Sequence, residues 1–243
     1  MEENILQLLD RCKLSLEELS KVKKLVTSKG ATAMCTPFSK ESFKDLIEIG
    51  FEQIKISSMD LNNFHLHKEI INCKQKLKLF ISTGMSSISE LKNIYQIYNN
   101  SNHEVCFLLC TSSYPSPNND ISLSNLVLYK SLFPKFRIGY SDHTVGNTAV
   151  VAAAALGAEY VEVHFSDDIR KSGPDQILSK TEKDLIKLKS KLKSIAELIL
   201  FKEKDLRLSE YSTWRTQKKG LYANKIIKKG EIIDDSNTIS QSP

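Results

Sequence analysis

Two apolar runs of the chain each end in a histidine: Ile138-Gly139-Tyr140-Ser141-Asp142-His143 and Tyr160-Val161-Glu162-Val163-His164. The histidines are 21 positions apart, which leaves room for one helix between two strands. Parallel neighbouring strands place their carboxyl ends on one edge of a sheet, where α/β enzymes hold their catalytic groups. Two imidazoles on that edge can bind a divalent metal and leave coordination positions open. We therefore expect His143 and His164 to form a metal site.

Six apolar, β-rich segments recur along the chain with helical segments between them. They lie near residues 31–36, 53–57, 77–82, 105–111, 136–141 and 159–164. This alternation predicts an α/β fold with a parallel sheet, and its spacing is typical of a (β/α) TIM-type barrel. A closed barrel of this type has eight strands. Residues 1–29 have a helical pattern, so we expect six of the eight strands.

Capping boxes predict where three helices begin. Ser15, Ser87 and Thr181 are each followed three positions later by an acidic residue. The helix after Thr181 is rich in lysine, and its apolar residues recur every three or four positions. They are Leu185, Leu188, Leu192, Ile195 and Ile199. The lysines are therefore expected on a solvated outer face.

Composition sets the class of protein. The 243 residues are 41% hydrophobic and 26% charged, which is typical of a globular protein with a sizeable core. A net charge of +5 fits an anionic substrate. The chain has no zinc-finger spacing, RNA-binding motif or basic arm, so we expect no nucleic-acid partner. Five cysteines without a C-x-x-C pair, no signal-peptide pattern and no membrane-length apolar run predict a cytoplasmic protein with reduced thiols and no membrane contact.

The end of the chain has a different character. Residues 210–219 are polar and are predicted to be a linker after a barrel domain over 1–209. Two short strand runs then flank the turn Lys229-Gly230. About twenty residues are too few to fold alone, so 220–243 is expected to be the start of a second domain.

Strand alternation sorts the side chains near the two histidines by face. Ser141 shares a face with His143, and Glu162 shares a face with His164. Glu162 can orient a metal ligand or act as a base, or it can be a structural carboxylate paired with a lysine. Lys55 lies within a strand, where an unpaired ammonium is costly, so its partner is either an anionic substrate or a carboxylate.

Polar groups also follow the other strands. Thr36, Ser82 and the run Thr111-Ser112-Ser113 end three of them, and hydroxyls with one lysine can hold a phosphate or carboxylate. Asp175 follows His164 by 11 positions on a loop over the same edge. The remaining histidines, His65, His67 and His103, lack this context, and His65-Leu66-His67 is expected on the surface.

These stretches together resemble the sialic acid (N-acetylneuraminate) synthase family. The resemblance covers roughly Ser15 to Ile233. It is carried by Cys35–Phe38, Lys55–Asn63, Ile81–Met85, Cys110–Pro115, Gly139–Thr144, Glu162–Phe165 and Gly173–Asp175. It implies an eight-stranded barrel followed by a small antifreeze-like (SAF) domain. On this basis 220–243 would be an incomplete antifreeze-like domain, and the chain resembles a member truncated at both ends.

The resemblance also implies a reaction. Members of the family condense phosphoenolpyruvate with an open-chain N-acetyl-hexosamine, usually N-acetylmannosamine, and release phosphate. His143 and His164 would bind a divalent metal, Mn²⁺ first, with Mg²⁺ or Co²⁺ as alternatives. His143, Glu162, His164 and Asp175 would be catalytic, Tyr114 and Asp175 would contact the sugar, and the enzyme would be a homodimer. Phosphoenolpyruvate would be held by Thr36, Lys55, Ser58, Ser82, Ser112 and Ser141.

Departures from the family pattern leave alternatives open. Ser112, Val163 and Gln176 stand where the family often has other residues, and its first two strands carry a glutamate and a lysine that are expected to lie outside this chain. The chain can therefore be a legionaminic or pseudaminic acid synthase, or an inactive remnant that keeps the metal and anion site. A third alternative, another aldol-type barrel such as a keto-sugar-acid phosphate synthase, is disfavoured by 140–144 and 173–175.

Overall fold

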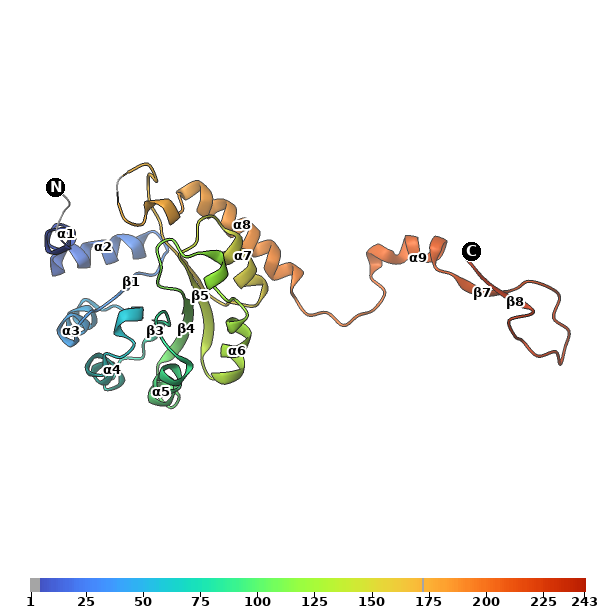
Figure 1. The fold of residues 1–243 in the computed structure, drawn as a ribbon, viewed down its shortest axis with the longest axis horizontal. Helices are drawn as coiled ribbons and strands as arrows, with labels where there is room; N and C mark the ends of the chain where they lie inside the picture. The colour runs from blue at the N-terminus through green and yellow to red at the C-terminus, as the bar shows by residue number, and fades with distance from the viewer. Residues whose placement is uncertain (1–4, 172) are drawn as a thin grey trace. The chain divides into compact units, whose positions relative to one another are not determined.

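A parallel sheet is the centre of the structure, a computed structural model that describes residues 5–171 and 173–243. Its six strands in these residues follow one another in chain order and curl into part of a barrel (Figure 1). The strands are β1 (Met34–Cys35), β2 (Gln53–Ile56), β3 (Lys78–Ser82), β4 (Glu104–Cys110), β5 (Arg137–Asp142) and β6 (Val161–Val163). Within the described residues, β1 and β6 each pair on one side, so the sheet is an open half-barrel.

Helices connect the strands and cover the outer face of the sheet (Figure 1). They are α1 (Ile5–Cys12), α2 (Leu16–Ser28), α3 (Lys40–Ile49), α4 (Phe64–Ile71), α5 (Ile88–Tyr98), α6 (Asn125–Leu132), α7 (Thr148–Ala155) and α8 (Glu182–Leu198). The predicted capping boxes at Ser15, Ser87 and Thr181 are confirmed, because each side chain accepts from the N3 backbone amide and the N3 acid returns the bond. The expected α/β class and parallel sheet are likewise confirmed.

Two layers of apolar side chains flank the sheet. The larger one lies between the strands and α3 to α8, and Phe107 is fully buried in it, with its ring centroid 5.1 Å from that of Phe133 and 5.0 Å from that of Phe136. The smaller one lines the concave face and contains Phe80, Cys106 and Leu108. The larger apolar core therefore lies on the convex side of the sheet. Polar residues at the strand ends lie on the concave side.

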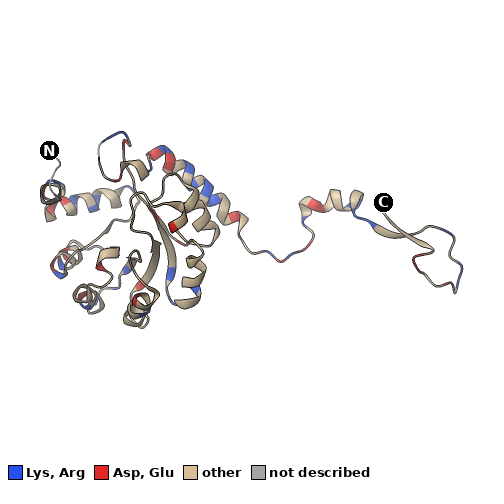
Figure 2. Ribbon diagram, viewed as in Figure 1, with Lys and Arg blue, Asp and Glu red and all other residues tan. Residues whose placement is uncertain are grey.

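The basic residues of the first unit are spread over its helices, as Figure 2 shows for α8. Leu188 is the buried residue of α8, and the lysines between Lys183 and Lys193 are exposed. The expected solvated lysine face is thus confirmed. In the described residues no helix is both long and apolar enough to cross a membrane.

Leu200–Pro243 forms a second unit. It contains a helix, α9 (Tyr211–Gln217), and an antiparallel pair, β7 (Gly220–Ala223) and β8 (Thr238–Gln241). The predicted linker over 210–219 is therefore helical in part. The second strand also begins later than expected after Lys229-Gly230, because the buried Asn237 side chain donates to the Ile232 carbonyl at 2.8 Å and holds this segment as a loop.

His67 corrects a prediction. It lies on α4 with 1% exposure, whereas the sequence indicates a surface position that only His65 occupies. Its Nε2 lies 3.0 Å from the Leu61 carbonyl oxygen, which can only accept, so Nδ1 accepts from the Tyr98 hydroxyl at 2.8 Å. Burial lowers the pKa of His67, and the bond to Leu61 opposes this. The helix period turns His67 inward and His65 outward, which the polar neighbours concealed.

We expect Phe107→Ala to lower the free energy of unfolding by about 3–5 kcal/mol, because it leaves a cavity among Phe133 and Phe136. Ile186→Ala, at a position 64% exposed on α8, is the control and should change it by less than about 0.5 kcal/mol. Urea unfolding followed by circular dichroism measures both. Equal losses in the two variants would contradict the assigned core.

We expect the stability to fall as the pH drops below about 6.5 in part because of His67. The folded chain keeps His67 neutral to lower pH than the unfolded chain does, so the unfolded chain binds the extra proton. His67→Gln should therefore lose less stability between pH 7 and pH 5 than the unsubstituted protein. Urea unfolding at both pH values measures this, with the exposed His65→Gln as control. An unchanged pH dependence in His67→Gln would show that His67 does not contribute.

Candidate functional site

The carboxyl ends of β5 and β6 bring the two predicted metal-binding histidines together. The strand register pairs Ser141 with Glu162, and each histidine follows two positions later. The centroids of the His143 and His164 rings are 5.2 Å apart. The ring of Tyr114, from the loop after β4, lies 4.2 Å from that of His143 and 5.9 Å from that of His164. Three strand ends thus supply three converging rings.

Each imidazole is oriented through its Nδ1 atom. His143 Nδ1 donates to the carbonyl oxygen of Thr111 at 2.7 Å, and His164 Nδ1 lies 3.4 Å from Asp175 Oδ2. Neither Nε2 atom has a hydrogen-bond partner within the described part of the chain. Metal-binding histidines have this arrangement, in which a carbonyl or carboxylate holds one ring nitrogen and the other keeps its lone pair.

The surroundings move the pKa values of the two imidazoles apart. Burial lowers the pKa of His164, the Asp175 carboxylate opposes this, and a charge on His143 adds to it. Burial also acts to lower the pKa of His143, but its hydrogen bonds with Cys110 and Thr111 outweigh burial and raise the pKa above the ordinary value. At neutral pH His164 is therefore neutral and can act as an electron-pair donor.

Lys55 and Glu162 form an ion pair on the concave face. The distance from Nζ to Oε1 is 3.0 Å, and the side chains are 15% and 31% exposed. A lysine within a strand is tolerated here because the carboxylate offsets the cost of burying its charge. The sequence predicts that Lys55 pairs with either an anionic substrate or a carboxylate, and in the structure its partner is the Glu162 carboxylate. The same pair supports the structural interpretation of Glu162, and Glu162 still lies close enough to act on the charge of both histidines.

Hydroxyl groups gather where β3 and β4 end. The Gly84 amide donates to Ser58 Oγ at 3.1 Å, and Ser58 Oγ donates to Cys110 Sγ at 3.7 Å. A Cβ at Gly84 would lie 2.2 Å from Ser112 Oγ, so this close approach requires a glycine. The hydroxyls of Ser112 and of Ser82, itself 2% exposed, have no hydrogen-bond partner in the described residues. Buried hydroxyls without partners suit the oxygens of an anion.

Of the other predicted site residues, Ser141 lies beside the site, and Thr36 has no hydrogen bond to the other candidates in the described residues. Ser141 is buried and lies opposite Cys110 in the β4–β5 register. Thr36 follows β1 and is half-buried, and no hydrogen bond or ion pair joins it to the other candidates in the described residues. Cys110, expected only as a buried thiol, lies 3.8 Å from His143 Nδ1. Its position as the last residue of β4 is the signal that could have placed it in the site.

Imidazole nitrogens are among the ligands that divalent cations take in proteins. No group of three or more His, Cys, Asp or Glu side chains in residues 5–171 and 173–243 is arranged to hold a metal ion. A cation held by the two imidazoles alone would keep its other positions open to water or a substrate.

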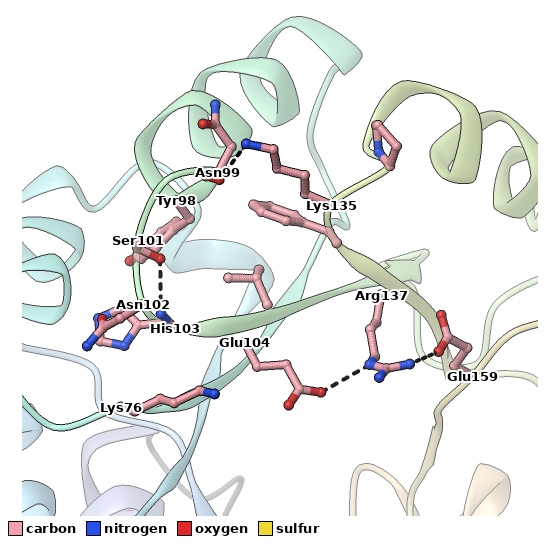
Figure 3. A pocket seen from close by; sticks show the side chains of 13 residues that line it. Lys76, Tyr98, Asn99, Ser101, Asn102, His103, Glu104, Lys135, Arg137 and Glu159 are labelled. Atoms are coloured by element: carbon pink, nitrogen blue, oxygen red, sulfur yellow. Dashed lines mark hydrogen bonds and ion pairs between the residues drawn. The ribbon is translucent and has the colours of Figure 1, made fainter.

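A cavity of about 600 Å³ lies at the opposite edge of the sheet from the two histidines (Figure 3). Arg137, at the start of β5, bonds to Glu104 at 3.1 Å and also pairs with Glu159. His103 is buried there, with its Nδ1 accepting from the Leu77 amide and its Nε2 near the Ile70 carbonyl. These groups satisfy one another at the amino ends of the strands, the edge that serves stability in such folds.

The fold is a parallel α/β half-barrel, and its carboxyl edge carries paired imidazoles, an ion pair and hydroxyl groups. This arrangement is typical of the active site of an enzyme. The sequence matches the NeuB family over residues 1–204. The chain therefore belongs to the NeuB family.

Individual relatives agree with this. The chain is 32% identical to N,N'-diacetyllegionaminic acid synthase of Campylobacter jejuni over 100% of its own length and 72% of the relative's. It is 33% identical to a pseudaminic acid synthase of the same species, over 98% of the chain and 68% of the relative. The crystal structure of N-acetylneuraminic acid (sialic acid) synthetase from Leptospira borgpetersenii superimposes with a TM-score of 0.78 at 29% identity, covering 88% of this chain and 74% of the other.

We expect Gly84→Ala to lower the free energy of unfolding by about 1–3 kcal/mol, because the new methyl group overlaps the hydroxyls of Ser112 and Ser58. The double variant Gly84→Ala/Ser112→Ala removes the nearest of these atoms and should recover part of the loss. Urea unfolding measures both. A Gly84→Ala protein as stable as the unsubstituted one would contradict the close packing of this cluster.

Proposed function

We propose that the chain is a nonulosonic acid synthase that condenses phosphoenolpyruvate with an open-chain N-acetyl-hexosamine and releases phosphate. The observation that supports it most is the pair of imidazoles, 5.2 Å apart, beside buried hydroxyls without partners. The relatives in the NeuB family are named as synthases of legionaminic, pseudaminic and N-acetylneuraminic acids. The geometry thus offers one place for a cation and one for an anion.

In this proposal His143 and His164 hold a divalent metal, Mn²⁺ in the first instance, through their Nε2 atoms. When bound, the metal supplies a Lewis acid for the aldehyde oxygen of the sugar. Asp175 keeps the His164 ring in place, and the Thr111 carbonyl does so for His143. Tyr114, beside both rings, would contact the sugar, together with Asp175.

The anion would be held by the concave face. Lys55 and the hydroxyls of Ser58, Ser82 and Ser112 can donate to phosphate and carboxylate oxygens. Thr36 and Ser141 complete the proposed set. The methylene carbon C3 of phosphoenolpyruvate would bond to the aldehyde carbon first, and the aldehyde oxygen would take up a proton. Water would then add at C2, the carbon that carries the phosphate, and phosphate would leave from C2 to give a 2-keto acid, with Glu162 as the acceptor of the water proton.

Three sugars are alternatives in this proposal: N-acetylmannosamine and the hexose precursors of legionaminic and pseudaminic acids. Two relatives that match nearly the whole chain, at 32% and 33% identity, are named as synthases of the latter two acids. We also propose that 220–243 belongs to an antifreeze-like domain and that the enzyme works as a homodimer in the cytoplasm.

The test combines binding and turnover. With Mn²⁺, phosphoenolpyruvate and each of the three sugars, the protein should release phosphate with one of them, measured by a coupled phosphate assay and by mass spectrometry of the nine-carbon product. His143→Ala and His164→Ala should each abolish Mn²⁺ binding, because two of the ligands are imidazoles, as followed by electron paramagnetic resonance of free Mn²⁺.

His65→Ala is the matched control, since it removes an exposed imidazole that is not among the proposed site residues. It should bind Mn²⁺ like the unsubstituted protein. Full metal occupancy in His143→Ala would refute the site. Metal and phosphoenolpyruvate binding without turnover of any sugar would favour the inactive remnant.

A further inference from the structure

A buried lysine joins the segments that carry the two histidines. Lys180 follows the loop of Asp175, and its side chain is 5% exposed. Its Nζ donates to the carbonyl oxygens of Gly146 at 2.5 Å, Leu178 at 3.1 Å and Thr144 at 3.4 Å. Two of these carbonyls belong to the turn directly after His143. One ammonium therefore connects that turn to the loop between β6 and α8.

Asp142 completes the arrangement on the outer side of β5. Its Oδ1 accepts from the Tyr140 hydroxyl at 3.1 Å, the Thr144 amide at 3.0 Å and Thr144 Oγ1 at 2.8 Å. Its Oδ2 lies 3.5 Å from Lys180 Nζ and accepts no hydrogen bond in the described residues. An ammonium has three hydrogens, and here three carbonyls use them. The carboxylate therefore acts on Lys180 through charge, and it also clamps the residues on both sides of His143.

The main chain of Lys180 reaches the second histidine. Its amide donates to the His164 carbonyl at 2.8 Å, and its own carbonyl accepts from the Ser166 amide at 3.0 Å. Asp175 is tied to the same place, because its carbonyl accepts from the Ser179 hydroxyl at 2.7 Å. The backbone of Lys180 thus holds His164 and Ser166, and the adjacent Ser179 holds Asp175, while the Lys180 side chain holds the turn after His143.

We propose that Lys180 is a positioning residue, which sets the distance between the imidazoles of His143 and His164 by joining the two segments that carry them. This rests on the proposed function only in that the imidazoles bind a metal. A neutral side chain cannot replace it, because three carbonyls and a buried carboxylate all face the same cation.

The test uses the full chain with Lys180→Met and, as matched control, Lys183→Met at an exposed position of α8. Lys180→Met should speed amide hydrogen exchange in 143–147 and in 176–181 together, measured by mass spectrometry. It should also weaken Mn²⁺ binding by roughly tenfold or more, since partners that orient a metal ligand typically contribute that much. Lys183→Met should change neither.

Lys180→Met also leaves Asp142 as a buried charge without a partner, which can destabilise the whole fold. A second variant is therefore needed to separate this loss of stability from a direct effect on the metal site. The double variant Lys180→Met/Asp142→Asn removes that charge and should recover most of the melting temperature, but the Mn²⁺ affinity should stay low because the three carbonyls remain unconnected. A recovered or unchanged Mn²⁺ affinity in the double variant would mean that Lys180 only stabilises the fold, and would overturn the proposal.

The outcomes for the two proposals are distinct. If the unsubstituted protein binds no Mn²⁺, the proposed function fails, and hydrogen exchange then decides on Lys180 alone. Exchange that rises in both segments would support the coupling of the two loops. Exchange that rises in 176–181 but not in 143–147 would overturn it.

Discussion

The register between β5 and β6 is the constraint on which the site depends. Ser141 faces Glu162 across the parallel ladder, so the residues two positions later emerge side by side. A shift of one residue would turn every side chain of β6 to the other face of the sheet. His164 and Glu162 would then point into the helical layer, and Glu162 would lose its ion pair with Lys55. The short ladder therefore determines the chemistry of the concave face.

Charge is distributed between the two faces accordingly. On the convex side the Asp142–Lys180 pair is closed off from solvent, with the Asp142 side chain 0% exposed and the Lys180 side chain 5% exposed. The concave face carries Lys55 and Glu162, which are partly accessible. A buried pair holds its geometry because neither partner can be solvated elsewhere, whereas a partly accessible pair can exchange one partner for a substrate. The Asp142–Lys180 pair is thus suited to holding loops together, and the Lys55–Glu162 pair is suited to binding a ligand.

The sequence predicted the fold where its signal is local. Capping boxes and apolar periodicity identified the helices and strands, and alternation correctly separated Ser141 and His143 from Asp142. The partners of those residues were harder to predict, because they come from distant segments. Nothing in the run around Lys180 indicates that it faces Asp142, since the contact depends on a loop. His67 was placed wrongly because its polar neighbours concealed an inward turn of α4. The second strand of the C-terminal unit begins later in the chain than predicted, at Thr238, because the buried Asn237 side chain bonds the Ile232 carbonyl and holds the preceding segment as a loop.

The strand order equals the order along the chain, and this has a consequence for how the molecule opens. In the described residues the backbone ladder joins each strand only to its neighbours in the chain, and the Lys55–Glu162 ion pair is a side-chain contact that links β2 to β6 across the concave face. In such a linear arrangement the terminal repeats exchange their amide hydrogens first and the middle last. β3, β4 and β5 form the persistent centre. β1 is two residues long and β6 is three, and each is bonded along one side in the described residues, so we expect both to open before the centre. Opening of β6 would move one of the two imidazoles.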